Sequence, residues 1–75
     1  MEIKEFLVNF AEQFEETCAD QIKPETEFKS LDEWDSMIAM SVIGITDAIY
    51  NVKLTGDDIR KARTIEDLFL IIQSK

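Results

Sequence analysis

The residues best suited to chemistry form the run Leu31-Asp32-Glu33-Trp34-Asp35-Ser36-Met37, where a serine joins a long connection to an apolar segment. A serine at the start of a helix has an exposed, accessible hydroxyl. A phosphate attached to that hydroxyl would lie near the positive end of the helix dipole and close to free backbone N–H groups. The run therefore predicts a serine that is well placed to carry a phosphodiester.

Two simpler interpretations of this run stay open. An Asp-Ser pair before an apolar helix is a common N-cap, so Asp35 or Ser36 is expected to cap the helix. The acids Asp32, Glu33 and Asp35 could indicate a cation site, but they lack the spacing and the glycine of a calcium loop. We expect them to form a solvated acidic rim. Trp34 is expected to anchor the connection onto the rest of the domain.

The chain has few other groups with which to catalyse a reaction. It contains no histidine and a single cysteine, so His-based acid/base catalysis, catalytic triads, His-ligated metals and an internal disulfide are all excluded. Cys18 is expected to be an inert, partly buried thiol near the end of the first helix. We therefore expect no enzyme and no metal site.

The first half of the chain must position the serine. Residues 2–16 have apolar side chains at helical spacing, with polar residues on the other side, and predict a first amphipathic helix. Between residues 17 and 35 this periodicity fades and Pro24 interrupts it. The segment is therefore interpreted as a long functional connection held by isolated apolar side chains. These are Ile22, Phe28, Leu31 and Trp34.

A second helix is predicted from Ser36 to about Asn51. Its wide apolar arc, which should pack against the first helix, consists of Ile38, Ala39, Val42, Ile43, Ile45, Ile49 and Tyr50. The opposite arc, called the methionine face below, consists of Ser36, Met37, Met40, Ser41, Gly44, Asp47 and Ala48. Small residues, two methionines and one acid fit neither a core nor a well-solvated surface, so this face is interpreted as a docking face, with Met37, Met40, Gly44 and Asp47 as contact residues.

Two T-x-x-D patterns mark the remaining helices. Thr55 with Asp58 predicts the cap of a short helix that ends near Ala62, and Thr64 with Asp67 predicts the cap of a last helix that ends near Ser74. No strand pair is evident. The fold class is therefore predicted to be all-α, a single domain over residues 1–75 built as a small bundle of three longer helices and one short helix.

Composition limits the partners of this domain. The 75 residues include sixteen Asp and Glu against eight Lys and Arg, a formal charge of −8, which disfavours nucleic acid and favours basic partners. The N-terminus does not resemble an export signal, and no apolar run is long enough to cross a bilayer. We expect a free-standing, monomeric cytoplasmic protein that does not insert into membranes.

The motif and its context together resemble the acyl carrier protein family. In that family the modified serine lies in a D-S-[L/M] motif at the start of the second helix, and Asp35-Ser36-Met37 matches it. Further residues fit the family's loop and its C-terminal half: Thr26, Phe28, Leu31, Leu54, Asp58, Ile59, Thr64, Ile65 and Leu68. The acidity and the helix order long, long, short, long are also similar, so the resemblance spans almost the whole chain.

The resemblance implies a cofactor and a set of partners. A phosphopantetheinyl transferase would attach 4′-phosphopantetheine from coenzyme A to Ser36, and the thiol of this arm would hold acyl groups as thioesters. Asp35 matches the acid that is associated with engaging the transferase and its Mg²⁺. The other partners would be acyl-transferring or synthase enzymes with basic or apolar docking patches, most simply in fatty acid or related lipid biosynthesis.

The second helix departs from the family in its charge. Typical fatty-acid carriers have several acids along this helix, whereas this chain has Ile38, Ser41 and Ala48 at such positions and keeps only Asp47. A carrier for a dedicated polyketide, nonribosomal peptide or other specialised pathway is therefore one alternative. An acidic helical adaptor without a prosthetic group is another.

Overall fold

The helix that begins at Ser36 is the longest element of the structure, a computed structural model that describes residues 2–17 and 19–75. This helix, α2, spans Ser36–Tyr50 and stops at Asn51, whose φ of 57° is left-handed. Asparagine tolerates this conformation better than most residues do, so it ends the helix without strain. The predicted end near Asn51 is confirmed.

The first helix, α1, is shorter than expected. It spans Ile3–Ala11, whereas residues 2–16 were predicted to be helical. Beyond Ala11 the backbone tightens, with Gln13 N–H donating to Phe10 O and Phe14 N–H donating to Ala11 O, each at 3.1 Å. The next backbone N–H groups turn toward a carboxylate from the connection, described below. The side chain of Phe14 nevertheless remains in the core, with 7% of its surface exposed.

The connection between α1 and α2 is held to the bundle along its length. It contains two 3₁₀ turns, Ala19–Gln21 and Phe28–Ser30, and its Ile22 and Phe28 side chains are buried. Trp34 packs edge-on against Phe28, with ring centroids 4.9 Å apart, and stacks on Phe10. The prediction that isolated apolar residues hold this segment is confirmed, and Trp34 is one of its anchors.

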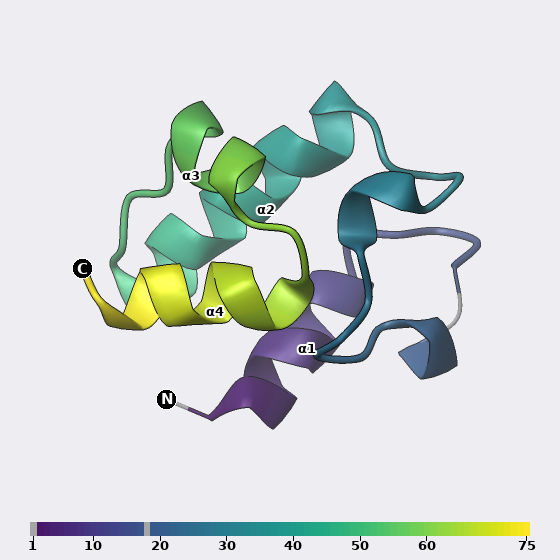
Figure 1. Cartoon of the computed structure of the whole chain (residues 1–75), viewed down its shortest axis with the longest axis horizontal. Coiled ribbons are helices and arrows are strands. Elements are labelled where there is room, and N and C mark those ends of the chain that lie inside the picture. The colour runs from purple at the N-terminus through teal and green to yellow at the C-terminus, as the bar shows by residue number, and fades with distance from the viewer. Residues whose placement is uncertain (1, 18) are drawn as a thin grey trace.

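The two short sequence patterns in the C-terminal part form the helix caps that they predict. Helix α3 spans Gly56–Lys61 and helix α4 spans Ile65–Gln73, and Thr55–Asp58 and Thr64–Asp67 form complete capping boxes at their starts. Among the described residues no strand is formed, and the domain is a small all-helical bundle, as expected. Figure 1 shows the connection on the side of the bundle away from both termini, and α2 begins where the connection ends.

The buried stripe of α2 differs from its predicted arc at three positions, of which one is Ile45, a half-buried residue that does not pack against the core. Thr46 is fully buried, and its hydroxyl donates to Val42 O at 2.8 Å, which satisfies the polar group inside the core. Ile49, predicted to be buried, is 54% exposed. It lies in the last turn of α2, where the contact with α1 is made by Tyr50, which packs on Phe6 and accepts a hydrogen bond from Asn9.

Candidate functional site

Asp35 and Ser36 have different positions at the start of α2. Asp35 is the N-cap, because its backbone is extended and its Oδ1 accepts a hydrogen bond from Ile38 N–H at 2.9 Å. Ser36 is the first helical residue, and its side chain is exposed. The prediction that Asp35 or Ser36 caps the helix is confirmed, and the cap is Asp35 and not Ser36. The Ser36 hydroxyl is not needed to cap the helix.

The first turn of α2 also differs in charge from the first turns of the other three α-helices that the structure describes. Glu5 lies in the first turn of α1, and α3 and α4 each carry two acids there, whereas the first turn of α2 contains none. Acids in a first turn offset the positive end of the helix dipole. In α2 only the preceding Asp35 does so, and a negative group on Ser36 would meet this positive end directly.

The methionine face lies on the exposed side of α2. Met37 and Met40 are 77% and 71% exposed, and Gly44 and Asp47 are also exposed. A β-carbon added at Gly44 would meet nothing within 4 Å. Packing within the chain therefore does not require a glycine there, although glycine inside a helix costs about 0.5–1 kcal/mol relative to alanine. Close approach of another molecule to α2 would explain a glycine at this position.

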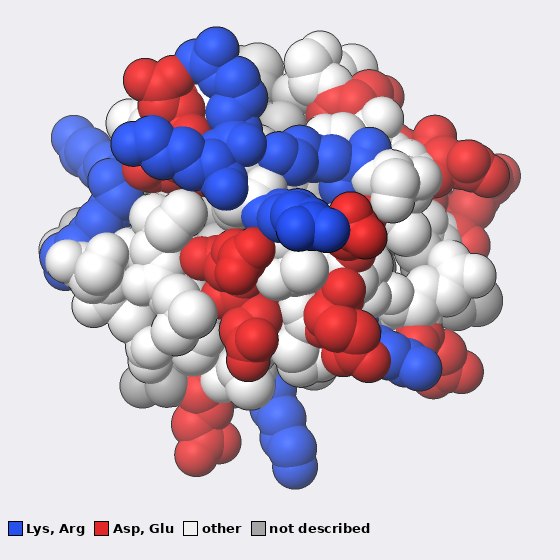
Figure 2. Space-filling model, in the orientation of Figure 1, with Lys and Arg blue, Asp and Glu red and all other residues white. Residues whose placement is uncertain are grey.

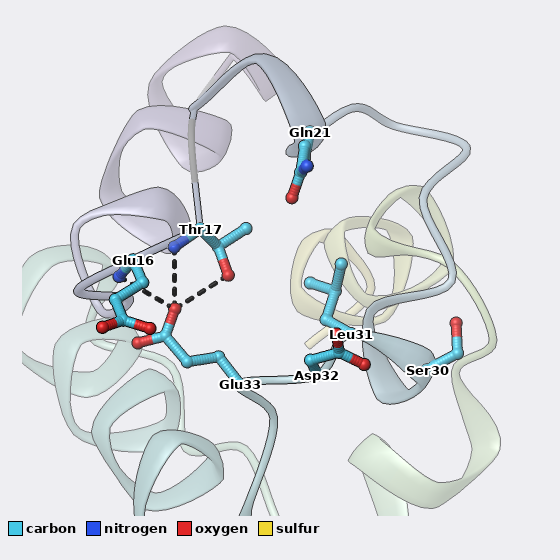
Figure 3. Close-up of a pocket in the computed structure, with 7 residues that line it drawn as sticks. All are labelled: Glu16, Thr17, Gln21, Ser30, Leu31, Asp32 and Glu33. Atoms are coloured by element: carbon cyan, nitrogen blue, oxygen red, sulfur yellow. Dashed lines mark hydrogen bonds between the residues drawn. The ribbon is translucent and has the colours of Figure 1, made fainter.

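Glu33, expected in the solvated rim, instead binds the backbone that follows α1. Its Oε2 accepts Glu15 N–H at 2.7 Å, and its Oε1 accepts Glu16 N–H, Thr17 N–H and the Thr17 hydroxyl at 3.0, 2.8 and 2.8 Å. Figure 3 shows the carboxylate turned toward residues 16 and 17. These hydrogen bonds, of which the one from Glu15 N–H has the largest effect, lower the pKa of Glu33 from 4.5 to about 2. Asp32 and Asp35 are exposed, as expected of the rim.

Two open hollows flank the Glu33 side chain. The larger, about 530 Å³, lies between the start of the connection and the turn before Trp34. Its lining, drawn in Figure 3, is Glu16, Thr17, Gln21, Ser30, Leu31, Asp32 and Glu33. The smaller, about 320 Å³, lies between the residues that follow α1 and the first two turns of α2. Only the smaller one borders the Ser36 site.

Charge is distributed unevenly over the molecule. Twelve of the sixteen acids precede Lys53, whereas five of the eight Lys and Arg residues lie from Lys53 onward. Figure 2 shows most of the visible basic side chains in the upper part of the view, over and beside α3, and others along the lower edge. Lys29 Nζ donates to Arg60 O, in α3, at 2.9 Å. The Ser36 end of α2 adjoins the acidic half of the chain, so its immediate field attracts cations.

The structure thus brings Asp35, Ser36 and Met37 together at one exposed helix start, with Met40, Gly44 and Asp47 along the same helix. The prediction for Cys18 falls outside the described residues. Among residues 2–17 and 19–75, no helix is long and apolar enough to cross a membrane. No protein-family model, no curated protein and no solved structure matches this chain.

Proposed function

We propose that this chain is an acyl carrier protein that bears 4′-phosphopantetheine on Ser36. The observation that carries the proposal is the exposed serine at the first position of α2, where Asp35 rather than Ser36 caps the helix. The uncharged first turn of α2 suits the single negative charge of a phosphodiester. We place the protein in the cytoplasm, as a monomer in fatty acid or related lipid biosynthesis.

Loading of Ser36 requires a separate transferase and coenzyme A. The Ser36 oxygen bonds to the pantetheine-bearing phosphorus as the bond from that phosphorus to the second phosphate breaks, and adenosine 3′,5′-bisphosphate leaves. The serine proton passes to a base on the transferase. When bound, the arm supplies the thiol that holds acyl groups as thioesters, and the chain itself positions and presents the arm without catalysing a reaction.

Asp35 has two roles in this proposal, and they can be separated by substitution. In Asp35→Asn the amide oxygen can still accept from Ile38 N–H, so we expect the melting temperature to change little, while the lost charge lowers the kcat/KM of loading by about tenfold. Asp35→Ala should in addition cost ~0.5–2 kcal/mol of stability through the lost cap. Thermal unfolding and loading kinetics measure the two effects. If Asp35→Asn were loaded with the kcat/KM of the wild type, the transferase would not recognise the charge of Asp35.

Gly44 tests whether the methionine face docks partners. Gly44→Ala should raise the free energy of unfolding by ~0.5–1 kcal/mol, because the β-carbon has room and alanine is the better helix former. The same substitution should lower the kcat/KM of a partner enzyme for the loaded carrier, because it obstructs close approach.

Gly56→Ala is the matched control, since Gly56 also has open space around it but lies on α3. It should leave partner kinetics unchanged. If Gly44→Ala and Gly56→Ala acted alike on partner kinetics, the methionine face would not be the docking surface.

The composition of the methionine face also indicates which pathway the carrier would serve. Its only acid is Asp47, and its largest exposed groups are Met37 and Met40, which suit a partner with an apolar patch as well as a basic one. A carrier dedicated to a polyketide, nonribosomal peptide or other specialised pathway is therefore the alternative carrier function. Intact mass of the protein from its native host tests the proposal most directly, because it reveals both the arm and its cargo.

The exposed methionines also favour a second candidate function. An acidic helical adaptor would bind a partner helix through Met37 and Met40 without any prosthetic group. Ser36 would then be dispensable, which is the opposite of what the carrier function requires.

A further inference from the structure

The smaller hollow beside Ser36, called the groove below, is lined by carboxylates, two other polar side chains and two apolar ones. Its walls are Gln13 and Glu15 from the segment after α1, Glu33 and Asp35 from the connection, and Met37, Ile38 and Ser41 from α2. Ser36 lies in sequence between two lining residues, Asp35 and Met37. At about 320 Å³ the groove is at the lower end of the ~300–1,000 Å³ range of small-molecule sites.

We propose that this groove is the resting site of the pantetheine part of the arm on Ser36. The inference rests on the proposed function. It adds the place where the arm lies when the carrier is not bound to a partner enzyme. The pantetheine part contains two amides, one hydroxyl and a pair of methyl groups on one carbon. A group tethered to Ser36 reaches this groove before any other hollow described above.

The polar walls of the groove match the amides and the hydroxyl. Glu33 uses Oε1 for three hydrogen bonds and Oε2 for one, so Oε2 retains capacity for a further donor. Asp35 uses Oδ1 for its cap bond, and Gln13 Nε2 donates to Asn9 O at 3.1 Å, which leaves the Gln13 carbonyl as an acceptor. The arm's N–H and O–H groups therefore find acceptors on the walls formed by the connection and by the segment after α1.

The remaining lining residues account for the orientation of the arm. The apolar side chains of Met37 and Ile38 offer contact for the two methyl groups, and Ser41, one turn beyond Met37, contributes a hydroxyl. Three carboxylates and no Lys or Arg line the groove, so the phosphate is excluded from it and stays at the helix start. The pantetheine part enters while the phosphate remains outside.

Nuclear magnetic resonance of the loaded protein tests this placement. We expect nuclear Overhauser contacts between the arm's paired methyl groups and the Met37 and Ile38 methyls, and shifted signals for the Gln13 side-chain amide. Loading is first verified by intact mass, so a protein that fails to load refutes the proposed function and not the groove. A loaded protein whose arm gives no such contacts refutes the groove alone.

Reactivity of the arm's thiol gives a second test, in a Cys18→Ser background so that the arm carries the only thiol. Alkylation of the loaded protein should be ~2–10-fold slower than that of free pantetheine, which corresponds to ~50–90% occupancy of the groove. Ser41→Trp fills the groove and should restore fast alkylation. Ala48→Trp, an exposed position of α2 outside the groove, should not. Equal rates in both variants would overturn the proposal.

Discussion

Replacing Ser36 with alanine is expected to abolish loading completely. Incubation of the wild type with coenzyme A and a broad-specificity phosphopantetheinyl transferase should add the mass of one arm, and Ser36→Ala should gain nothing. The fold should survive, because Ser36 is exposed and the helix is capped by Asp35. Intact mass spectrometry measures the first effect and circular dichroism the second.

Ser41→Ala is the matched control for this experiment. Ser41 is also an exposed serine of α2 but lies away from the helix start, so this variant should load as the wild type does. A wild type that stays unmodified with an active transferase would remove the basis of the carrier function.

The adaptor function predicts a different pattern in the same set of variants. Ser36→Ala should then leave partner binding and cellular function intact, while Met37→Glu or Met40→Glu should abolish both, because the charge disrupts an apolar contact. A carrier should lose function with Ser36→Ala whatever happens at the methionines. Complementation in the native host with these three variants separates the two functions.

Local signals in the sequence were enough to predict most of the helix boundaries. The capping boxes at Thr55 and Thr64, and the start of α2 after Asp35, follow from side chains that bond to backbone within three residues. The exposed serine at Ser36 follows from the same local chemistry. Such contacts are specified by spacing alone, so a sequence pattern reveals them.

Contacts between distant segments were beyond the reach of these patterns. The end of α1 at Ala11 is accompanied by Glu33 binding residues 15–17, and no spacing rule links a carboxylate to amides 16–18 positions away. Glu33 stands in a run of acids that all look alike, and only the tertiary arrangement selects it. Thr46 was missed because its hydroxyl bonds within its own helix, which lets a polar residue enter the core.

Removing the carboxylate of Glu33 is expected to destabilise the fold strongly. One side chain accepts three backbone N–H groups and one hydroxyl, so Glu33→Ala leaves four donors without their partner. We expect the melting temperature to fall by about 5 °C or more. Asp32→Ala, an exposed acid beside it, should change the melting temperature far less.

The pH dependence of Glu33→Gln identifies the charge as the cause. The folded-state pKa of Glu33 is about 2, below its ordinary value of 4.5, so folding favours the ionised form. Its stabilising contribution is therefore complete above about pH 4.5 and declines as the pH falls toward 2, because across this range the unfolded chain takes up a proton on Glu33 while the folded protein does not. The stability difference between wild type and Glu33→Gln, from urea unfolding at several pH values, should be largest near pH 6 and shrink across this window. A difference that stays constant from pH 6 to pH 2 would mean that packing, and not the carboxylate charge, holds the segment after α1 in place.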